Sequence, residues 1–225
     1  MYVPFLRDKD LVRCVQKILD IIENAKNKNI FTNGLDPFGA FFDTIAAGGI
    51  SYDKWLHLEQ VRQSQKTLQN AIGNFHEEVM GCVEGCRSNP RGQGADILNK
   101  SESWCAELKN KFNTTKGNHK GAVHEDIERW VHHYEEKYGQ EFTGYYCYVI
   151  PRTPGDIDQI WHFSRYHNPK IREITYAALL DKATGVQDSL RKLYLCLPML
   201  LDKELSTATK MKVKHMKMLF KKNIR

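Results

Sequence analysis

The chain has 225 residues, of which 41% are hydrophobic and 27% are charged, and its formal net charge is +6. These values are ordinary for a globular protein, and no apolar run approaches the ~20 residues that a membrane helix needs. The N-terminus lacks the basic-then-apolar order of a secretory signal, and most cysteines stand alone in apolar segments, where reduced thiols are usual. We therefore expect a cytoplasmic protein, whose positive charge permits a polyanionic partner without requiring one.

The first part of the chain is predicted to be helical. Apolar residues at helical spacing predict a helix over residues 8–27. After loops around a short helix, a second long helical region is expected, which Ser51 caps and which runs to about Cys86. We treat residues 1–60 as a helical N-terminal region, and its sequence assigns it no role.

In the centre of the chain the hydrophobic period changes from that of helices to that of strands. The elements expected there, in chain order, are a strand over 94–99, a turn over 100–103, a strand over 104–112, a polar loop over 113–121, an amphipathic helix over 122–138 and an apolar strand over 142–150. The first two strands should form an antiparallel hairpin. The second and third should run parallel, joined by a right-handed helical crossover. The fold class predicted for residues 61–205 is therefore α/β, a mixed central sheet flanked by helices.

The C-terminal part is predicted to hold one more helix and a basic tail. The helix spans residues 186–201, and Pro198 should kink or end it. Residues 206–225 carry seven Lys and Arg side chains. Such a tail is compatible with simple solvation and with added contacts to phosphates.

The predicted hairpin places two acidic side chains opposite each other. With a turn at 100–103, Asn99 lies opposite Trp104, and the same register puts Asp96 opposite Glu107. Directly opposed residues have Cβ atoms about 4.5–5.5 Å apart, so two carboxylates there repel each other unless a cation lies between them. A hard divalent cation bound through oxygen ligands meets that requirement.

A lysine completes the predicted site. Strand alternation puts Lys109 on the same face as Glu107. A metal ion held by Asp96 and Glu107 can polarise a phosphoryl oxygen and lower the pKa of a bound water. Lys109 can orient or deprotonate that water, or stabilise charge on the phosphate. The carbonyl of Leu108 is a further oxygen ligand for Mg²⁺, which usually takes few protein ligands.

The helix before the hairpin offers a third acid. Relative to the apolar stripe of that helix, Glu78 lies on the flank, whereas Glu77 points nearly the opposite way. We therefore predict Glu78 as an accessory metal ligand. A solvated glutamate at the helix edge remains an equally good interpretation.

The spacing of the hairpin residues resembles a known motif. Asp96, ten intervening residues and then Glu107, Leu108 and Lys109 resemble the PD-(D/E)XK motif of a nuclease superfamily that includes many type II restriction endonucleases. Ala95 stands where that motif often has proline. The resemblance implies a restriction-endonuclease-like fold with Asp96, Glu107 and Lys109 as catalytic residues.

Two longer stretches carry the resemblance further. The segment from Ala106 to Gly117 is similar to the restriction enzymes that read GGNCC-type sites, and so is the segment from Ile171 to Tyr194. The similarity spans about residues 65–200, and the first 60 residues match nothing in that group. It implies Mg²⁺-dependent cleavage of double-stranded DNA at a short palindrome by a homodimer.

Two polar clusters are candidates for DNA contact. The loop after the second strand suits phosphate binding, and the basic cluster after the third strand suits guanine recognition in the major groove. The candidates in the loop are Asn113, Thr114, Thr115, Lys116, His119 and Lys120, and those in the later cluster are Arg152, Arg165, Asn168, Lys170 and Arg172. Ordinary surface polarity is the alternative for each of them.

Three other functions remain open from the sequence. A repair or junction-resolving nuclease of the same superfamily would share the site but cut branched or damaged DNA. A non-enzymatic DNA-binding protein would carry the acidic pair by accident. A nuclease that acts on RNA would differ only in its substrate.

Overall fold

The computed structural model describes residues 1–26, 28–90 and 92–204, so the predicted basic tail lies outside the described residues. The chain divides into two compact units. One consists of Arg13–Phe75, and the other combines Met1–Val12 with His76–Arg225. The boundary expected at residue 60 falls inside a long helix, and the N-terminal twelve residues belong with the larger unit.

The smaller unit is helical, as the sequence predicts. The helices that contribute to it are α1 (Asp8–Lys26), the 3₁₀ turn η1 (Ile30–Asn33), α2 (Pro37–Ala46) and α3 (Tyr52–Gly81). The Asp36 side chain accepts a hydrogen bond from the Phe38 amide and so caps α2. The hydroxyl of Ser51 accepts one from the Lys54 amide at 3.4 Å, which confirms the predicted cap of α3.

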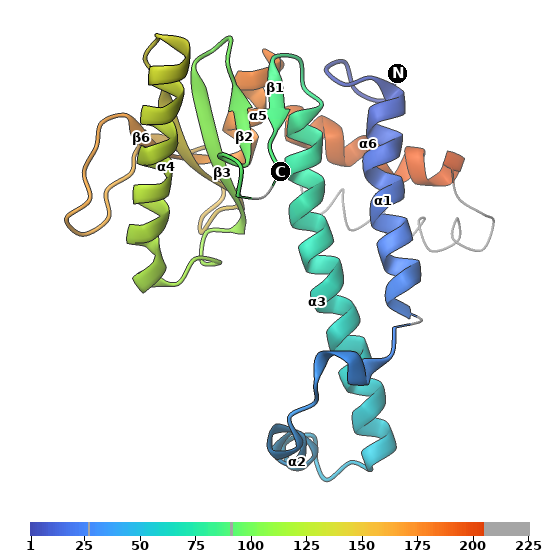
Figure 1. Cartoon of the computed structure of the whole chain (residues 1–225). Helices are drawn as coiled ribbons and strands as arrows, with labels where there is room; N and C mark the ends of the chain where they lie inside the picture. Colours follow the sequence, from blue (N-terminus) through green and yellow to red (C-terminus); the bar gives the residue numbers. More distant parts are fainter. Residues whose placement is uncertain (27, 91, 205–225) are drawn as a thin grey trace. The chain divides into compact units, whose positions relative to one another are not determined.

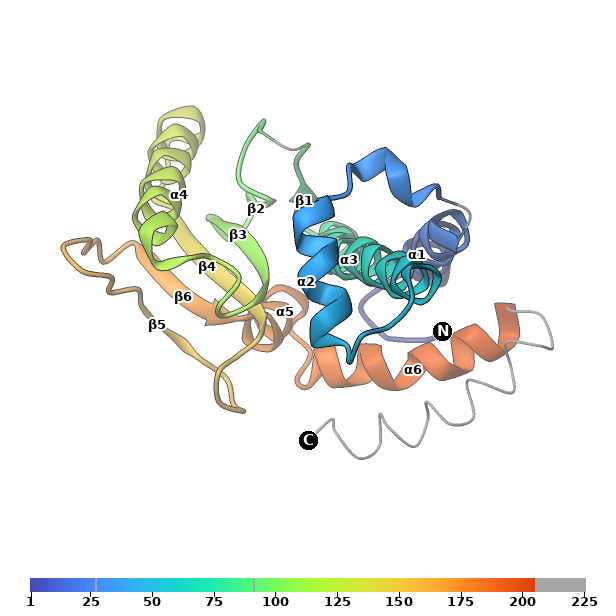
Figure 2. The same cartoon turned by 90° about the horizontal axis from the view of Figure 1, so that it is seen from below.

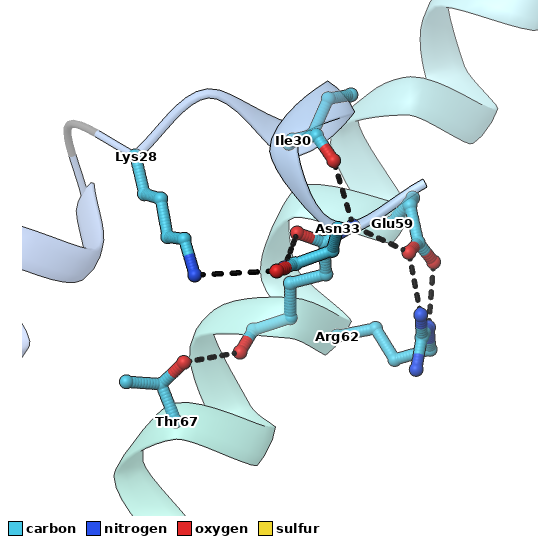
Figure 3. A network of polar contacts seen from close by, with 7 residues as sticks. Lys28, Ile30, Asn33, Glu59, Arg62 and Thr67 are labelled. Carbon is cyan, nitrogen blue, oxygen red and sulfur yellow. Dashed lines mark hydrogen bonds and ion pairs between the residues drawn. The ribbon is translucent and has the colours of Figure 1, made fainter. Parts of the chain in front are cut away.

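Polar contacts hold the segment before α2 against α3 (Figure 3). The Gln63 side chain donates to the Ile30 carbonyl at 3.2 Å and accepts from the Asn33 amide group at 2.8 Å. Lys28 donates to the Asn33 side chain at 3.3 Å. Because the two Gln63 bonds join residues 30 and 33 positions apart, they fix η1 on α3 rather than merely closing a local turn.

The larger unit is built on one mixed sheet. Its strands are β1 (Cys86–Ser88), β2 (Ile97–Asn99), β3 (Trp104–Lys111), β4 (Thr143–Ile150), β5 (Asp158–Ile160) and β6 (Ile171–Thr175). Their order across the sheet is β1-β2-β3-β4-β6-β5. The hairpin of β2 with β3 is antiparallel, and β3 and β4 are parallel, as predicted. The sequence did not predict β1, β5 and β6, two of which have only three residues.

Helix α4 (Gly117–Tyr138) is the predicted crossover between β3 and β4, and it lies along one face of the sheet (Figures 1 and 2). Ile127 and Val131 of α4 belong to the same buried cluster as Cys105 and Tyr146 of the strands. Gly144 allows this close packing, because a side chain there would collide with Ile127 and Val131. The glycine at position 144 therefore allows α4 to lie close to the sheet.

Two further helices follow the sheet. Thr175 caps α5 (Tyr176–Thr184), and Lys182 of α5 lies 5.9 Å from the ring centroid of Tyr145, a β4 residue that alternates with those under α4. Helix α6 (Ser189–Glu204) begins three residues later than predicted and continues past Pro198. Proline therefore does not end this helix, whose Leu193 and Leu200 are fully buried. None of the described helices is long and apolar enough to cross a membrane.

In the part of the chain that the structure describes, one histidine is buried without hydrogen bonds to the nitrogens of its ring. The His124 ring of α4 packs against the rings of Trp161 and Tyr166, whose centroids are 5.5 and 5.4 Å away. Within the described residues, neither of its ring nitrogens has a hydrogen-bond partner. Burial lowers the pKa of His124, and the nearby Glu128 and Glu125 oppose that shift only in part.

Acidification should therefore destabilise the fold through His124. A histidine whose pKa is lower in the folded state costs no stability above its unfolded pKa, about 6.5, because it is neutral in both states there. As the pH falls below that value the unfolded chain takes up the proton more readily, and stability decreases. We expect His124→Phe to reduce the loss of melting temperature between pH 7.5 and 5.5. An unchanged pH dependence in this variant would contradict the assignment, and His132→Phe, an exposed position on α4, is the matched control.

Candidate active site

The hairpin has the register that the sequence predicts. Asn99 pairs with Trp104, and Ile97 pairs with Ala106. Asp96 directly precedes β2, and its carboxylate oxygen Oδ2 accepts a hydrogen bond from the Leu108 amide at 2.7 Å. This bond holds the Asp96 carboxylate against β3, next to Glu107.

Glu107 and Lys109 share one face of β3. The Lys109 Nζ donates to Glu107 Oε1 at 2.6 Å, and both side chains are 23% exposed. Trp104, Ala106 and Leu108 are buried on the alternate positions of the strand. The predicted arrangement of two acids and one lysine at the same place on the sheet is therefore present in the structure.

The electrostatics of the site show an excess of negative charge. Burial, followed by the charge of Asp96, raises the pKa of Glu107, and Lys109 only partly opposes this. Burial by itself would lower the pKa of Lys109, but the carboxylates of Glu107 and Asp96 outweigh it and raise this pKa. The lysine is thus held in its charged form, while the charge of Asp96 still disfavours the ionisation of Glu107.

These side chains open into a cavity of about 840 Å³. Strand residues form one wall, and polar residues of α4 form another. The lining consists of Glu77, Gly92, Gly94, Asp96, Glu107, Leu108, Lys109, Asp126, Arg129, Trp130 and His133. Arg129 forms an ion pair with Asp126, so the cavity holds two cationic and four carboxylate side chains.

The acid that α3 contributes to this cavity is Glu77, and Glu78, which helical spacing favoured, is not part of the lining. The reason lies in the buried face of α3. His76 and Met80 are buried together with Phe75 and Val79, so the buried face is wider than the apolar stripe alone and is turned towards His76. Apolar periodicity did not reveal this face, because a histidine does not count as an apolar position. In the structure the His76 ring lies 2.8 Å from the Tyr194 hydroxyl.

The sequence also missed the cavity residues of α4. Asp126, Arg129 and His133 recur at spacings of three and four, which puts them on one side of the helix beside its apolar stripe. A crossover helix that packs over β3 must bring one of its edges near Glu107 and Lys109, so that spacing was the available signal. Trp130 packs against the buried cluster and also lines the cavity.

Comparison with known proteins identifies the family. The family model described as Eco47II restriction endonuclease matches residues 3–206. The chain belongs to the Eco47II restriction endonuclease family. It is 32% identical to the type II restriction enzyme Eco47II of Escherichia coli over 206 residues, which cover 87% of this chain and 85% of that enzyme. It is 28% identical to the type II restriction enzyme Sau96I of Staphylococcus aureus over 222 residues, with coverages of 92% and 82%. No solved structure matches the chain.

Membership of the Eco47II family confirms that the chain is a type II site-specific deoxyribonuclease with a restriction-endonuclease-like α/β fold. It excludes a non-enzymatic role and favours restriction over repair and over cleavage of RNA. The match begins at residue 3, so the helical N-terminal region belongs to the family as well. The resemblance read from the sequence began only at about residue 65.

The first DNA-contact cluster lies where β3 leads into α4. The predicted loop is shorter than expected because α4 begins at Gly117, so His119 and Lys120 stand in its first turn. Apolar periodicity starts only at Val123, which hid this turn from sequence analysis. The buried Tyr146 hydroxyl donates a hydrogen bond to the Thr115 hydroxyl oxygen at 3.1 Å, and Lys116 is exposed at the N-cap of α4. Asn113 and Thr114 are also exposed.

Members of the second cluster differ in their surroundings. Asn168 donates to Glu128 at 2.6 Å, Lys170 pairs with Glu135 at 2.7 Å, and Arg172 pairs with Asp158 at 2.6 Å. Arg152 and Arg165 are exposed, and the Arg165 guanidinium lies 5.4 Å from the Tyr166 ring centroid. Three of the five predicted DNA contacts thus have acidic partners within the chain.

The repulsion between Asp96 and Glu107 leads to a stability prediction. Because the folded state raises the pKa of Glu107, its ionised form destabilises the metal-free protein at neutral pH. We expect Glu107→Gln to raise the melting temperature by a few degrees in the presence of a chelator, which corresponds to about 1 kcal/mol for a chain of this length. Glu136→Gln, at an exposed position of α4, should leave it unchanged. A lower melting temperature for Glu107→Gln would show that the carboxylate stabilises the fold.

Proposed function

We propose that this enzyme is a Mg²⁺-dependent homodimer that cuts both strands of duplex DNA at a short, GGNCC-like palindrome. Asp96, Glu107 and Lys109 are its catalytic residues. The observation that carries this proposal is the Asp96–Glu107 pair, with Lys109 bonded to Glu107, in one cavity. The cytoplasm is the proposed compartment, as the isolated cysteines of the sequence suggest.

The residues present suit Mg²⁺ better than a softer metal. Among the described residues, no three His, Cys, Asp or Glu side chains come together as a metal site. Mg²⁺ commonly takes one or two carboxylates and keeps several waters, so Asp96 and Glu107 with the Leu108 carbonyl form a sufficient ligand set. Zn²⁺, which favours four nitrogen or sulfur ligands, finds no such set here. Glu77 replaces Glu78 in our proposal as the accessory acid, because it lines the cavity.

The roles of the side chains follow from their positions. When bound, Mg²⁺ supplies Lewis-acid stabilisation of the phosphate and lowers the pKa of a bound water. Asp96 is held in place by the Leu108 amide, so its carboxylate is oriented before substrate binds. Lys109 keeps its proton because two carboxylates surround it, which favours charge stabilisation and water positioning over a role as general base.

The requirement for two cuts supports the homodimer. A palindrome presents the same phosphate environment on both strands, related by a two-fold axis. One chain has one such catalytic constellation among its described residues. Two copies related by the same axis therefore match the symmetry of the substrate. The GGNCC-like sequence rests on the resemblance of the segments from Ala106 and Ile171, and the exposed Arg165 is a candidate for guanine contact.

Cleavage of plasmid DNA tests the mechanism. The purified protein with Mg²⁺ should produce discrete fragments, and a chelator should prevent them. Glu107→Ala should lower the cleavage rate by at least about 100-fold, since it removes a metal ligand and the partner of Lys109. The rate is measured from fragment intensities on gels over time.

The matched control for this experiment is Glu136→Ala, which should cleave at the normal rate. Discrete fragments that form equally fast with Glu107→Ala would remove the proposed mechanism while leaving the family assignment intact. Sequencing the fragment ends would show whether the site is a GGNCC-like palindrome.

The basic residues differ in whether an acidic side chain of the same chain already pairs with them. Lys116 is exposed at the N-cap of α4, and Lys120 lies in the first turn of the helix, 5.7 Å from the Phe163 ring centroid. We propose that these two contact phosphates, with the help of Asn113 and Thr114. Lys170, by contrast, is engaged with Glu135.

Salt dependence of DNA binding distinguishes these lysines. Each phosphate contact contributes about one to the slope of log K against log salt concentration. We expect Lys116→Ala to reduce that slope by about 1, measured by fluorescence anisotropy in a chelator so that no cleavage occurs. Lys170→Ala is the matched control and should leave the slope unchanged. Equal slopes for the native protein and Lys116→Ala would contradict the proposed contact.

A further inference from the structure

Helix α2 turns its large side chains towards solvent. Phe38, Phe41, Phe42 and Ile45 recur at spacings of three, one and three, which places them on one stripe of the helix. Each of them is 52–72% exposed, and no residue of α2 is buried. Such a stripe normally faces a protein interior.

The opposite side of α2 carries only small residues. Ala40 and Thr44 are partly covered, and α2 stands beside the start of α3 in Figure 1. A hydrophobic helix that covers its small residues and exposes its large ones gains little from packing within its own unit. Large contiguous apolar patches on soluble proteins usually mark interaction sites.

The stripe is held in a defined arrangement. The Phe42 ring contacts those of Phe38 and Phe41, with centroids 4.9 and 5.4 Å apart. The side chain of Asp36 caps the helix, and Gln63 fixes the preceding turn on α3. These side chains therefore lose little conformational entropy when a partner binds.

The segment that carries the stripe offers phosphates little attraction. Between Lys28 and Lys54 the sequence contains no Lys or Arg, although the chain carries 33 of them in total. Asp36, Asp43 and Asp53 are the charged residues of that interval, and the Arg62 guanidinium on α3 lies close enough to Asp43 to interact with its charge. An apolar and acidic segment therefore suits a protein partner better than DNA or an anionic membrane.

The size and shape of the surface suit a second copy of the same chain. If a fully exposed side chain of this size presents about 200 Å², the stripe together with Tyr52 presents about 600 Å². Two copies would then bury about 1,200 Å², the lower limit of stable specific interfaces. A hollow of about 380 Å³ lies beside the stripe, lined by Leu35, Ile50, Tyr52 and Trp55 among others. A surface with both a protrusion and a hollow can complement itself about a two-fold axis.

We propose that the α2 stripe, defined as Phe38, Phe41, Phe42 and Ile45, is the homodimer interface of this restriction enzyme. The inference rests on the proposed function, which requires two copies, and it adds the surface that joins them. It also gives the helical N-terminal region a role, namely assembly.

Sedimentation velocity of the full chain tests this interface. The native protein should be a dimer at micromolar concentration, and Phe38→Glu with Phe42→Glu should raise the dimer dissociation constant at least about 100-fold, because each change occurs twice in a symmetric contact. Phe38→Leu with Phe42→Leu should remain dimeric. Met199→Glu, at a 52% exposed apolar position on α6, is the matched control and should also remain dimeric. Circular dichroism should show equal helix content in all variants, since the altered side chains are exposed.

The possible outcomes distinguish a failure of the proposed interface from a failure of the proposed function. A native protein that is monomeric with and without DNA, or a Glu double variant that stays dimeric, would overturn the interface. Dissociation by Met199→Glu alone would place the contact on α6 and also overturn it. If the native protein fails to cleave DNA but is a dimer that the Glu double variant dissociates, the interface stands and the proposed function fails.

Discussion

The site depends on one constraint, the opposition of two carboxylates across a hairpin whose register is fixed. The turn between β2 and β3 fixes this register and is held by side-chain hydrogen bonds. The buried Asn99 side chain accepts hydrogen bonds from the Ser101 hydroxyl at 2.8 Å and from the Glu102 amide at 3.0 Å. A slip of one residue in β3 would turn Glu107 and Lys109 to the opposite face of the sheet. The arrangement of the two acids and Lys109 is therefore set at the turn, several residues away from the acids themselves.

Local pairing explains which parts of the structure the sequence could predict. The register of β2 and β3 follows from a short turn, and the parallel pairing of β3 with β4 follows from the length of the crossover, so both were predictable. Strands β1 and β5 have three residues each and carry no recognisable alternation. Their pairing depends on the sheet that is already there, and the sequence alone does not show it.

Residues brought to the site by tertiary packing were harder to find. Whether Glu77 or Glu78 reaches the cavity depends on the rotation of α3, which the buried His76 helps to set. Likewise, the basic cluster after β4 looked uniform in the sequence. Lys170 and Arg172 have acidic partners on α4 and β5, respectively, which only folding brings near. Net charge therefore overstates the basic surface that this protein offers to DNA.

Helix α4 both packs on the sheet and lines the cavity of the site. Its Ile127 and Val131 rest on Gly144, while Asp126 and Arg129, one or two positions away, line the same cavity as Glu107 and Lys109. The distance between α4 and β3 across this cavity therefore depends on how closely the core packs at position 144. A larger residue there would push α4 outward and widen the cavity, although position 144 is not among the residues that line it.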